Sequence, residues 1–161
     1  FCKENDIQYA NAVKKIPLND SSVEILYTSH MVEHLDRLEV RSFLKESKRV
    51  LINGGVIRIV IPDLEKIVKI YVKNLDADAF MSKSLLYFDK PNNFLSKVKF
   101  LLVGARHHLW MYDKKSISKL LLENGFKDPK ILDPGSTTVN NPGELNLHEK
   151  EEESIFIEAI A

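Results

Sequence analysis

Residues 23–63, VEILYTSHMVEHLDRLEVRSFLKESKRVLINGGVIRIVIPD, contain two apolar runs of strand length with a helical pattern between them. The first run is Val23–Tyr27, and the second is Val56–Ile61, which Arg58 interrupts. Two buried runs joined by a helix are typical of a strand–helix–strand unit whose strands lie side by side in parallel. This stretch therefore predicts an α/β fold with a mostly parallel sheet.

The predicted helix between these strands follows from apolar residues that recur at spacings of three, four and seven. Asp36 is a capping residue at its start, and Glu39 follows three residues later. We expect the helix to stop at residues 53–55, Asn-Gly-Gly, because these residues tolerate the left-handed backbone of a helix C-terminus. The residues expected to face the core are Leu35, Leu38, Phe43, Leu44, Val50 and Leu51.

Further elements are predicted after Asp63. Asp63 is a cap for a helix that we expect to pack on the sheet, and Asp113 is a cap for another helix that ends at Gly125. Strands are expected at Lys127–Leu132 and Ser154–Ile160, with a polar, solvated loop between them. The apolar stripe of the first helix consists of Leu64, Ile67, Val68, Tyr71 and Val72.

Residues 76–112 depart from a simple alternation of strand and helix. This segment is rich in Phe and His, and it is far longer than a connection inside a compact domain needs. We expect it to form a helical lid above the strand ends. Residues 1–161 are predicted to form a single domain around one core, with this lid as an insertion.

Composition restricts the classes of function. The chain has 161 residues, of which 44% are hydrophobic and 29% charged, and its formal net charge is zero. Balanced charge gives no electrostatic footprint for nucleic acid. The single cysteine, Cys2, excludes an internal disulfide and favours a reducing compartment. No apolar run approaches the roughly 20 residues that span a bilayer, so we expect a cytoplasmic protein.

Three stretches resemble class I S-adenosylmethionine-dependent methyltransferases. They are TSHMVEHL (28–35), KRVLINGGVIRIVIPDLE (48–65) and RHHLWMYDKKSISKLLLENGF (106–126). The likeness is closest to a small branch with the pattern SHVLEHL, RVLKPGG and RVVVPDLE, although Asn53 stands where that branch usually has Pro. The resemblance implies a Rossmann-like methyltransferase fold, an antiparallel C-terminal strand and S-adenosylmethionine as the cofactor.

Four residues are predicted to bind the cofactor. The segment NAVKKIPLND (11–20) resembles a family segment in which an Asp lies near the adenine, and Asn11, followed by Ala12, takes that place. Ser29 and His30 end the first strand, and ligands bind outside the carboxyl ends of strands in such sheets. The alternatives are an ordinary turn for Asn11, and a local turn cap and local packing for Ser29 and His30.

One part of the family's cofactor site is missing from the sequence. The family opens with a strand, a glycine-rich turn and a helix, yet none of the six glycines here precedes residue 54. We expect this N-terminal part to be truncated, and a relative that never had it is the alternative. The chain alone is therefore expected to bind S-adenosylmethionine weakly or not at all, and an N-terminally extended protein to bind it in roughly the micromolar range.

A second cluster, His107, His108, Trp110 and Tyr112, lies on the predicted lid. Aromatic and imidazole side chains there suit closure over a substrate and the supply of a base. We expect His108, Trp110 and Tyr112, together with His34, to bind the substrate, with core anchoring as the alternative for the two aromatic residues. Imidazole titrates near neutrality, so His30 or His107 is the predicted catalytic base for a hydroxyl acceptor.

His30, Glu33 and His34 spell H-x-x-E-H, the signature of one class of zinc peptidases. In that class the motif lies inside a long helix, whereas here it directly follows a strand that ends at Ser29. We therefore expect no metal site, while zinc hydrolysis and a metal shared with a hydroxylated substrate remain alternatives.

The function expected is a methyltransferase acting on a hydroxyl of a small molecule or glycan. A non-catalytic methyltransferase-like module that binds a ligand or a partner is the main alternative. Residues 94–106, FLSKVKFLLVGAR, also suit an interfacial membrane helix. The expected partners are a small-molecule or glycan substrate and no nucleic acid, and a homo-oligomer remains open.

Overall fold

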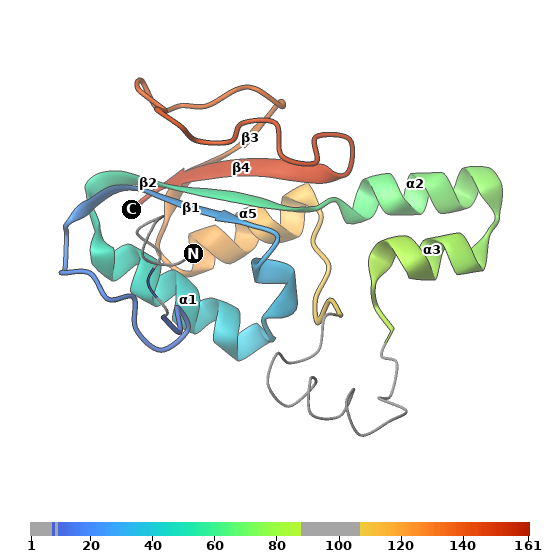
Figure 1. The fold of residues 1–161 in the computed structure, drawn as a ribbon, viewed down its shortest axis with the longest axis horizontal. Helices are drawn as coiled ribbons and strands as arrows, with labels where there is room; N and C mark the ends of the chain where they lie inside the picture. Colours follow the sequence, from blue (N-terminus) through green and yellow to red (C-terminus); the bar gives the residue numbers. More distant parts are fainter. Residues whose placement is uncertain (1–7, 9, 88–106) are drawn as a thin grey trace.

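The computed structural model describes residues 8, 10–87 and 107–161, which fold around one four-stranded sheet (Figure 1). Among these residues, β4 runs against the other strands of the order β1-β2-β4-β3. The predicted α/β fold with a mostly parallel sheet and an antiparallel C-terminal strand is therefore confirmed. The elements are β1 (Val23–Ser29), η1 (Val32–His34), α1 (Arg37–Val50), β2 (Leu51–Pro62), α2 (Leu64–Asn74), α3 (Ala77–Ser84), α5 (Lys114–Glu123), β3 (Lys127–Leu132) and β4 (Ser154–Ile160).

Strand pairing brings distant parts of the chain to one edge of the sheet. β1 and β2 pair in parallel, as predicted, and Ser29 lies opposite Val60 at the carboxyl end. β4 pairs antiparallel with β2, and its first residue, Ser154, lies opposite Pro62. The antiparallel strand thus begins where the parallel strands end. Residues before Ser154 consequently lie near the ligand-facing edge of the sheet.

The helix α1 begins as predicted but ends early. The Asp36 side chain accepts hydrogen bonds from the backbone N–H groups of Leu38 and Glu39, and the Glu39 side chain accepts from the Asp36 N–H. The helix ends at Val50, so the predicted end at residues 53–55 is wrong. Leu38 was also wrongly expected to face the core, since its side chain is 77% exposed in the first turn.

The Asn-Gly-Gly sequence instead forms an irregular start to β2, where the register with β1 shifts. Gly54 has a φ of +83°, which suits glycine. Gly55 lies so close to β1 that a Cβ there would be 3.1 Å from the Glu24 carbonyl oxygen. The same glycines that can end a helix therefore allow the sheet to form immediately after it.

The two faces of the sheet have different cover. Helices α1 and α5 lie on one face, and their apolar residues pack on alternate residues of β2 and β4 (Figure 1). This core includes Val40, Phe43, Leu44, Ile57, Ile59, Ile61, Ile117, Leu120, Leu121, Ile155 and Ile157. The long connection between β3 and β4 covers the other face and bonds to side chains of the central strands. This cover buries an ion pair.

Arg58 and Glu158 form that ion pair, with Arg58 Nη1 2.6 Å from Glu158 Oε1 and side-chain exposures of 0% and 1%. Arg58 Nη1 also donates to the Ser136 carbonyl at 3.0 Å, and Thr137 and Thr138 donate to the Glu158 carboxylate. Burial opposes ionisation, but these hydrogen bonds hold the pKa of the Glu158 carboxyl below its ordinary value. The pair ties the β3–β4 connection to the centre of the sheet.

The helices α2 and α3 form a hairpin that projects beyond the sheet (Figure 1). Its helices pack on each other, with the Tyr71 and Phe80 rings 5.5 Å apart, and Ile67 is the one residue of α2 that is buried. The prediction that α2 packs on the sheet is wrong. Within the described residues, no helix is long and apolar enough to cross a membrane.

The lid prediction for residues 76–112 concerns a segment of which 88–106 lies outside the described residues. Its first part forms α3, and residues 107–112 lead into α5. The interfacial helix expected for residues 94–106 also lies outside them. Both stay predictions.

Removing one partner of the buried ion pair should destabilise the fold strongly. Glu158→Leu leaves the Arg58 charge buried and unpaired, which should lower the free energy of unfolding by about 3–5 kcal/mol. Urea denaturation measures this change. The exposed pair Lys69–Glu65 provides the control, and Glu65→Leu should cost at most about 1 kcal/mol. The double variant Arg58→Met/Glu158→Leu should recover most of the loss, and a double variant as unstable as the single one would contradict this account.

The same carboxylate should make stability depend on pH. The pKa of Glu158 is lowered in the folded state, so its contribution is present above the ordinary value of 4.5 and is lost as the pH falls through the folded pKa. The stability difference between the wild type and Glu158→Leu should therefore be constant from about pH 7 to 5 and shrink below about pH 4. Denaturation curves across this range measure it. A difference that grows in acid would refute the assignment.

Candidate functional site

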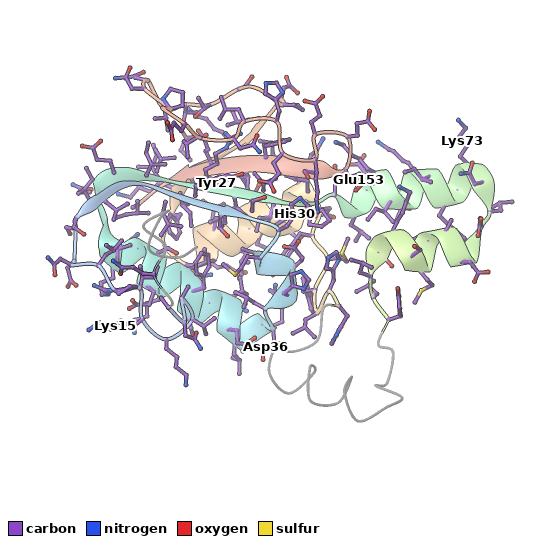
Figure 2. The ribbon with its side chains drawn as sticks, in the orientation of Figure 1. Lys15, Tyr27, His30, Asp36, Lys73 and Glu153 are labelled. Carbon is purple, nitrogen blue, oxygen red and sulfur yellow. The ribbon has the colours of Figure 1, made fainter. Side chains whose placement is uncertain are left out.

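His30 lies at the carboxyl end of β1 in a tight turn. Its φ is +47°, in the left-handed region, and its N–H donates to the Val60 carbonyl at 2.9 Å. The ring lies between two polar groups, with Nδ1 3.2 Å from Glu33 Oε1 and Nε2 3.2 Å from Ser154 Oγ. Figure 2 shows His30 at the same end of the sheet as Glu153. His30 therefore occupies the edge at which β1, β2 and β4 meet.

Glu33 is the buried centre of this region. Its side chain is 1% exposed, and neither carboxylate oxygen has a hydrogen-bond partner of acceptable geometry among the described residues. Its backbone carbonyl accepts hydrogen bonds from the N–H groups of Leu109 and Trp110, at 2.8 and 3.1 Å. The sequence places Glu33 in an H-x-x-E-H spacing but predicts no buried role for it. Its burial depends on the segment 107–112, which no local pattern reveals.

Two further imidazoles lie beside Glu33. His34 Nδ1 is 2.9 Å from the His107 carbonyl oxygen, and the rings of His34 and His108 meet edge to face at 5.0 Å. His108 Nε2 is 3.9 Å from Glu33 Oε1. Burial lowers the pKa of His108, which favours a neutral ring. His30, Glu33, His34 and His108 thus form one cluster, called here the histidine cluster.

The remaining residues of the predicted substrate site divide between surface and core. Trp110 is 43% exposed, and the Arg37 guanidinium lies 4.7 Å from its ring centre. Tyr112 is 1% exposed within the hydrophobic core, and burial raises the pKa of its phenol. His107 is half-buried and bonds to His34 through its carbonyl. This placement suits an anchor for the segment 107–112 and leaves Tyr112 without access to a substrate.

A cavity of about 100 Å³ adjoins the histidine cluster and is lined by both His30 and His108. Its other lining residues are Pro62, Lys66, Ile67, Ile70, Lys83, Leu85, Lys150, Glu152 and Glu153. The sequence did not predict a place at this cavity for Lys150, Glu152 and Glu153, because an acidic run is typical of a solvated loop. One signal could have found them: a last strand that is antiparallel must begin at the carboxyl edge of the others.

The predicted cofactor residues are only partly brought together. Ser29 directly precedes His30, and its buried hydroxyl has no hydrogen-bond partner of good geometry, although Tyr27 and Glu149 lie near it. Tyr27 donates to Glu149 at 2.8 Å, and this bond lowers the pKa of the Glu149 carboxyl. A buried hydroxyl without a partner at a strand end fits a ligand site.

Asn11 and Ala12 lie in a separate turn. Asn11 is exposed, and its side-chain oxygen accepts from the Val13 N–H at 3.1 Å, while Ala12 packs against the core. Among the described residues, no hydrogen bond or ion pair joins this turn to Ser29 or His30. The residues present therefore fit one side of a cofactor site, at the end of β1.

Comparison with known proteins supports the resemblance seen in the sequence. Residues 2–59 match the family model described as a methyltransferase domain. Solved S-adenosylmethionine-dependent methyltransferases share the fold. The enzyme from Thermotoga maritima is 20% identical to this chain with a TM-score of 0.51, and that from Methanosarcina mazei is 19% identical with a TM-score of 0.55. The enzyme from Aquifex aeolicus is 13% identical with a TM-score of 0.51. They align with 96%, 96% and 99% of this chain, which spans 63%, 66% and 58% of their own lengths.

No curated protein matches the sequence. The predicted likeness to class I S-adenosylmethionine-dependent methyltransferases and the Rossmann-like fold are confirmed.

If Tyr112 is an anchor, its ring and not its hydroxyl should stabilise the protein. Tyr112→Phe removes a buried hydroxyl that has no hydrogen-bond partner of good geometry, although Arg37 lies near it, so stability should stay within about 1 kcal/mol. Tyr112→Ala should cost about 3–5 kcal/mol through the cavity it leaves. Chemical denaturation of both variants measures this. A large loss in Tyr112→Phe would instead reveal a hydrogen bond that holds the hydroxyl.

Proposed function

We propose that this chain forms part of an S-adenosylmethionine-dependent methyltransferase that methylates a hydroxyl group of a small molecule or glycan. One observation carries the proposal: His30 and His108, which are far apart in the sequence, line one cavity at the carboxyl edge of the sheet. Ligands of sheets with this topology bind at that edge. The family match and the solved structures support the type of reaction.

The cavity offers a suitable environment for a small acceptor. Apolar residues of α2 and the loop after α3 form part of its wall, while lysine and glutamate side chains line its other side. Lys66 donates to the carbonyls of Glu151 and Ser154, and Lys83 pairs with Glu153, so both cations are already held in place. A mixed wall of this kind favours an uncharged polar acceptor over a highly charged one.

When bound, S-adenosylmethionine supplies the methyl group from its sulfonium centre. Ser29 and His30 are proposed to hold it at the end of β1, with Asn11 and Ala12 at the adenine, as the family resemblance implies. Because such a transfer is an in-line displacement, the main task of the protein is to position donor and acceptor. The proposed acceptor contacts are His34, His108 and Trp110.

A hydroxyl acceptor must also lose a proton, and His30 is placed to receive it. The Glu33 carboxylate, 3.2 Å from Nδ1, favours a hydrogen on that nitrogen and leaves the lone pair on Nε2. Nε2 lies near the Ser154 hydroxyl and can take the acceptor's proton. The Glu33–His30 pair thus orients a base beside the cavity. His107 remains the alternative base.

Replacing the base should reduce turnover more than binding. His30→Gln keeps a polar side chain but cannot accept the proton, so kcat should fall by about 10²- to 10⁴-fold. Transfer of a tritiated methyl group from S-adenosylmethionine to a panel of simple sugars and hydroxylated small molecules measures it, in the protein that carries the residues expected before Phe1. His148→Gln is the matched control, because His148 also pairs with a carboxylate, Glu151, but lies on the surface.

Calorimetric titration of S-adenosylmethionine distinguishes the alternatives. Binding by the extended protein, together with loss of turnover in His30→Gln and none in His148→Gln, supports the proposal. Equal turnover in both variants removes His30 from the role of base. No binding of S-adenosylmethionine by the extended protein would favour the non-catalytic module.

A further inference from the structure

The Glu33 carboxylate poses a physical problem. A carboxylate taken out of water needs hydrogen bonds or a countercharge, and Glu33 is 1% exposed with no hydrogen bond of acceptable geometry to either oxygen among the described residues. The nearest polar groups are ring nitrogens, His30 Nδ1 at 3.2 Å and His108 Nε2 at 3.9 Å. The second distance is too long for a hydrogen bond.

The tautomers of the neighbouring rings point to an unused set of lone pairs. A carbonyl oxygen can only accept, so His34 Nδ1, 2.9 Å from the His107 carbonyl, carries the hydrogen and leaves a lone pair on Nε2. His108 Nδ1 lies 3.3 Å from the Met111 sulfur, a weak acceptor, and the ring also interacts with the Ser84 backbone. The tautomer with the hydrogen on Nδ1 leaves the Nε2 lone pair toward Glu33. A backbone carbonyl behind an imidazole is the usual support for a metal-ligating histidine.

We propose that Glu33, His34 and His108 form a binding site for a divalent transition-metal ion of the zinc type. One ligand atom from each of these residues lies within 4.8 Å of the other two. Two imidazole nitrogens and one carboxylate oxygen are the donors that Zn²⁺ prefers, whereas Mg²⁺ and Ca²⁺ favour oxygen ligands. The inference does not rest on methyl transfer.

The distances suit a site that closes on binding. Bonds of about 2.0–2.2 Å place tetrahedral ligands about 3.4 Å apart, and the ligand atoms here lie up to 4.8 Å apart, so the widest pair must draw together by at most about 1.4 Å. The 3.9 Å between Glu33 Oε1 and His108 Nε2 needs to shorten by only about 0.5 Å to reach that spacing. Glu33 and His34 lie in the short η1 turn and His108 in an irregular segment, so no long helix opposes this movement.

The H-x-x-E-H motif of this chain thus supplies different ligands from those of the zinc peptidases. His30 lies in the left-handed turn after β1, and η1 is a single 3₁₀ turn, so the long peptidase helix is absent here. The third ligand comes from His108 instead of His30. His30 Nδ1, 3.2 Å from Glu33 Oε1, then lies beside the Glu33 carboxylate and outside the ligand set.

Three protein ligands leave a fourth position of the metal open. His108 also lines the cavity described above, so this position is accessible to a water molecule or an oxygen of a bound molecule. The site therefore has the composition of a reactive metal centre and not that of a closed structural one.

The test is calorimetric titration of ZnCl₂ into the untagged, metal-free chain, with visible absorption of the Co²⁺ form as a second readout. We expect one equivalent of Zn²⁺ to bind, intense bands of tetrahedral Co²⁺ and a rise in Tm with the metal. Loss of a supporting residue usually costs 10- to 100-fold in affinity, so Glu33→Gln and His34→Gln should each cost more than about 100-fold. His148→Gln, which alters an exposed histidine near Glu151, should bind as the wild type does.

Two results would overturn the proposal. One is the absence of stoichiometric Zn²⁺ binding by the folded wild-type chain, which would leave Glu33 as a partner of His30 alone. The other is wild-type affinity in both Glu33→Gln and His34→Gln. Circular dichroism establishes folding of each variant, and His34→Gln, at a half-buried position, keeps the test decisive if Glu33→Gln does not fold.

Discussion

The parallel pairing of β1 and β2, closed by the hydrogen bond from His30 N–H to the Val60 carbonyl, determines the geometry of the rest of the molecule. It fixes the point at which β1 ends and the chain turns toward η1. The antiparallel strand β4 then delivers Ser154 to the same edge, and the Glu33 carbonyl holds the segment 107–112 by two backbone bonds. Four segments distant in the sequence therefore meet without a dedicated site loop.

Strand identities and helix starts could be predicted from the sequence, because both have local causes. Apolar runs marked β1 and the buried part of β2, and Asp36 and Asp113 supplied real capping boxes. The end of α1 could not be predicted, since two glycines permit a helix terminus and an irregular strand start equally well. The prediction that α2 packs on the sheet was wrong for another reason. An apolar stripe on a helix requires a packing partner but does not identify it, and here that partner is α3.

The candidate site was predictable to the extent that it follows from topology. His30, His34 and His108 were expected near the strand ends, and the structure places them around Glu33. The importance of Glu33 was not predictable, because its burial arises from packing of a segment more than 70 residues away along the chain. The cofactor role of Asn11 and Ala12 was predicted from the family resemblance alone, and among the described residues no hydrogen bond or ion pair joins them to Ser29 or His30.

The left-handed backbone of His30 restricts which residues evolution can place there. A φ of +47° is costly for most side chains and most costly for β-branched ones, whereas Gly, Asn, Asp and His enter this region more readily. The position thus admits few residue types, and most of them carry a polar side chain. Substitutions at position 30 would therefore exchange an imidazole for an amide, a carboxylate or no side chain at all. Related sequences should therefore vary in the functional group at this position while they keep the left-handed backbone of the turn.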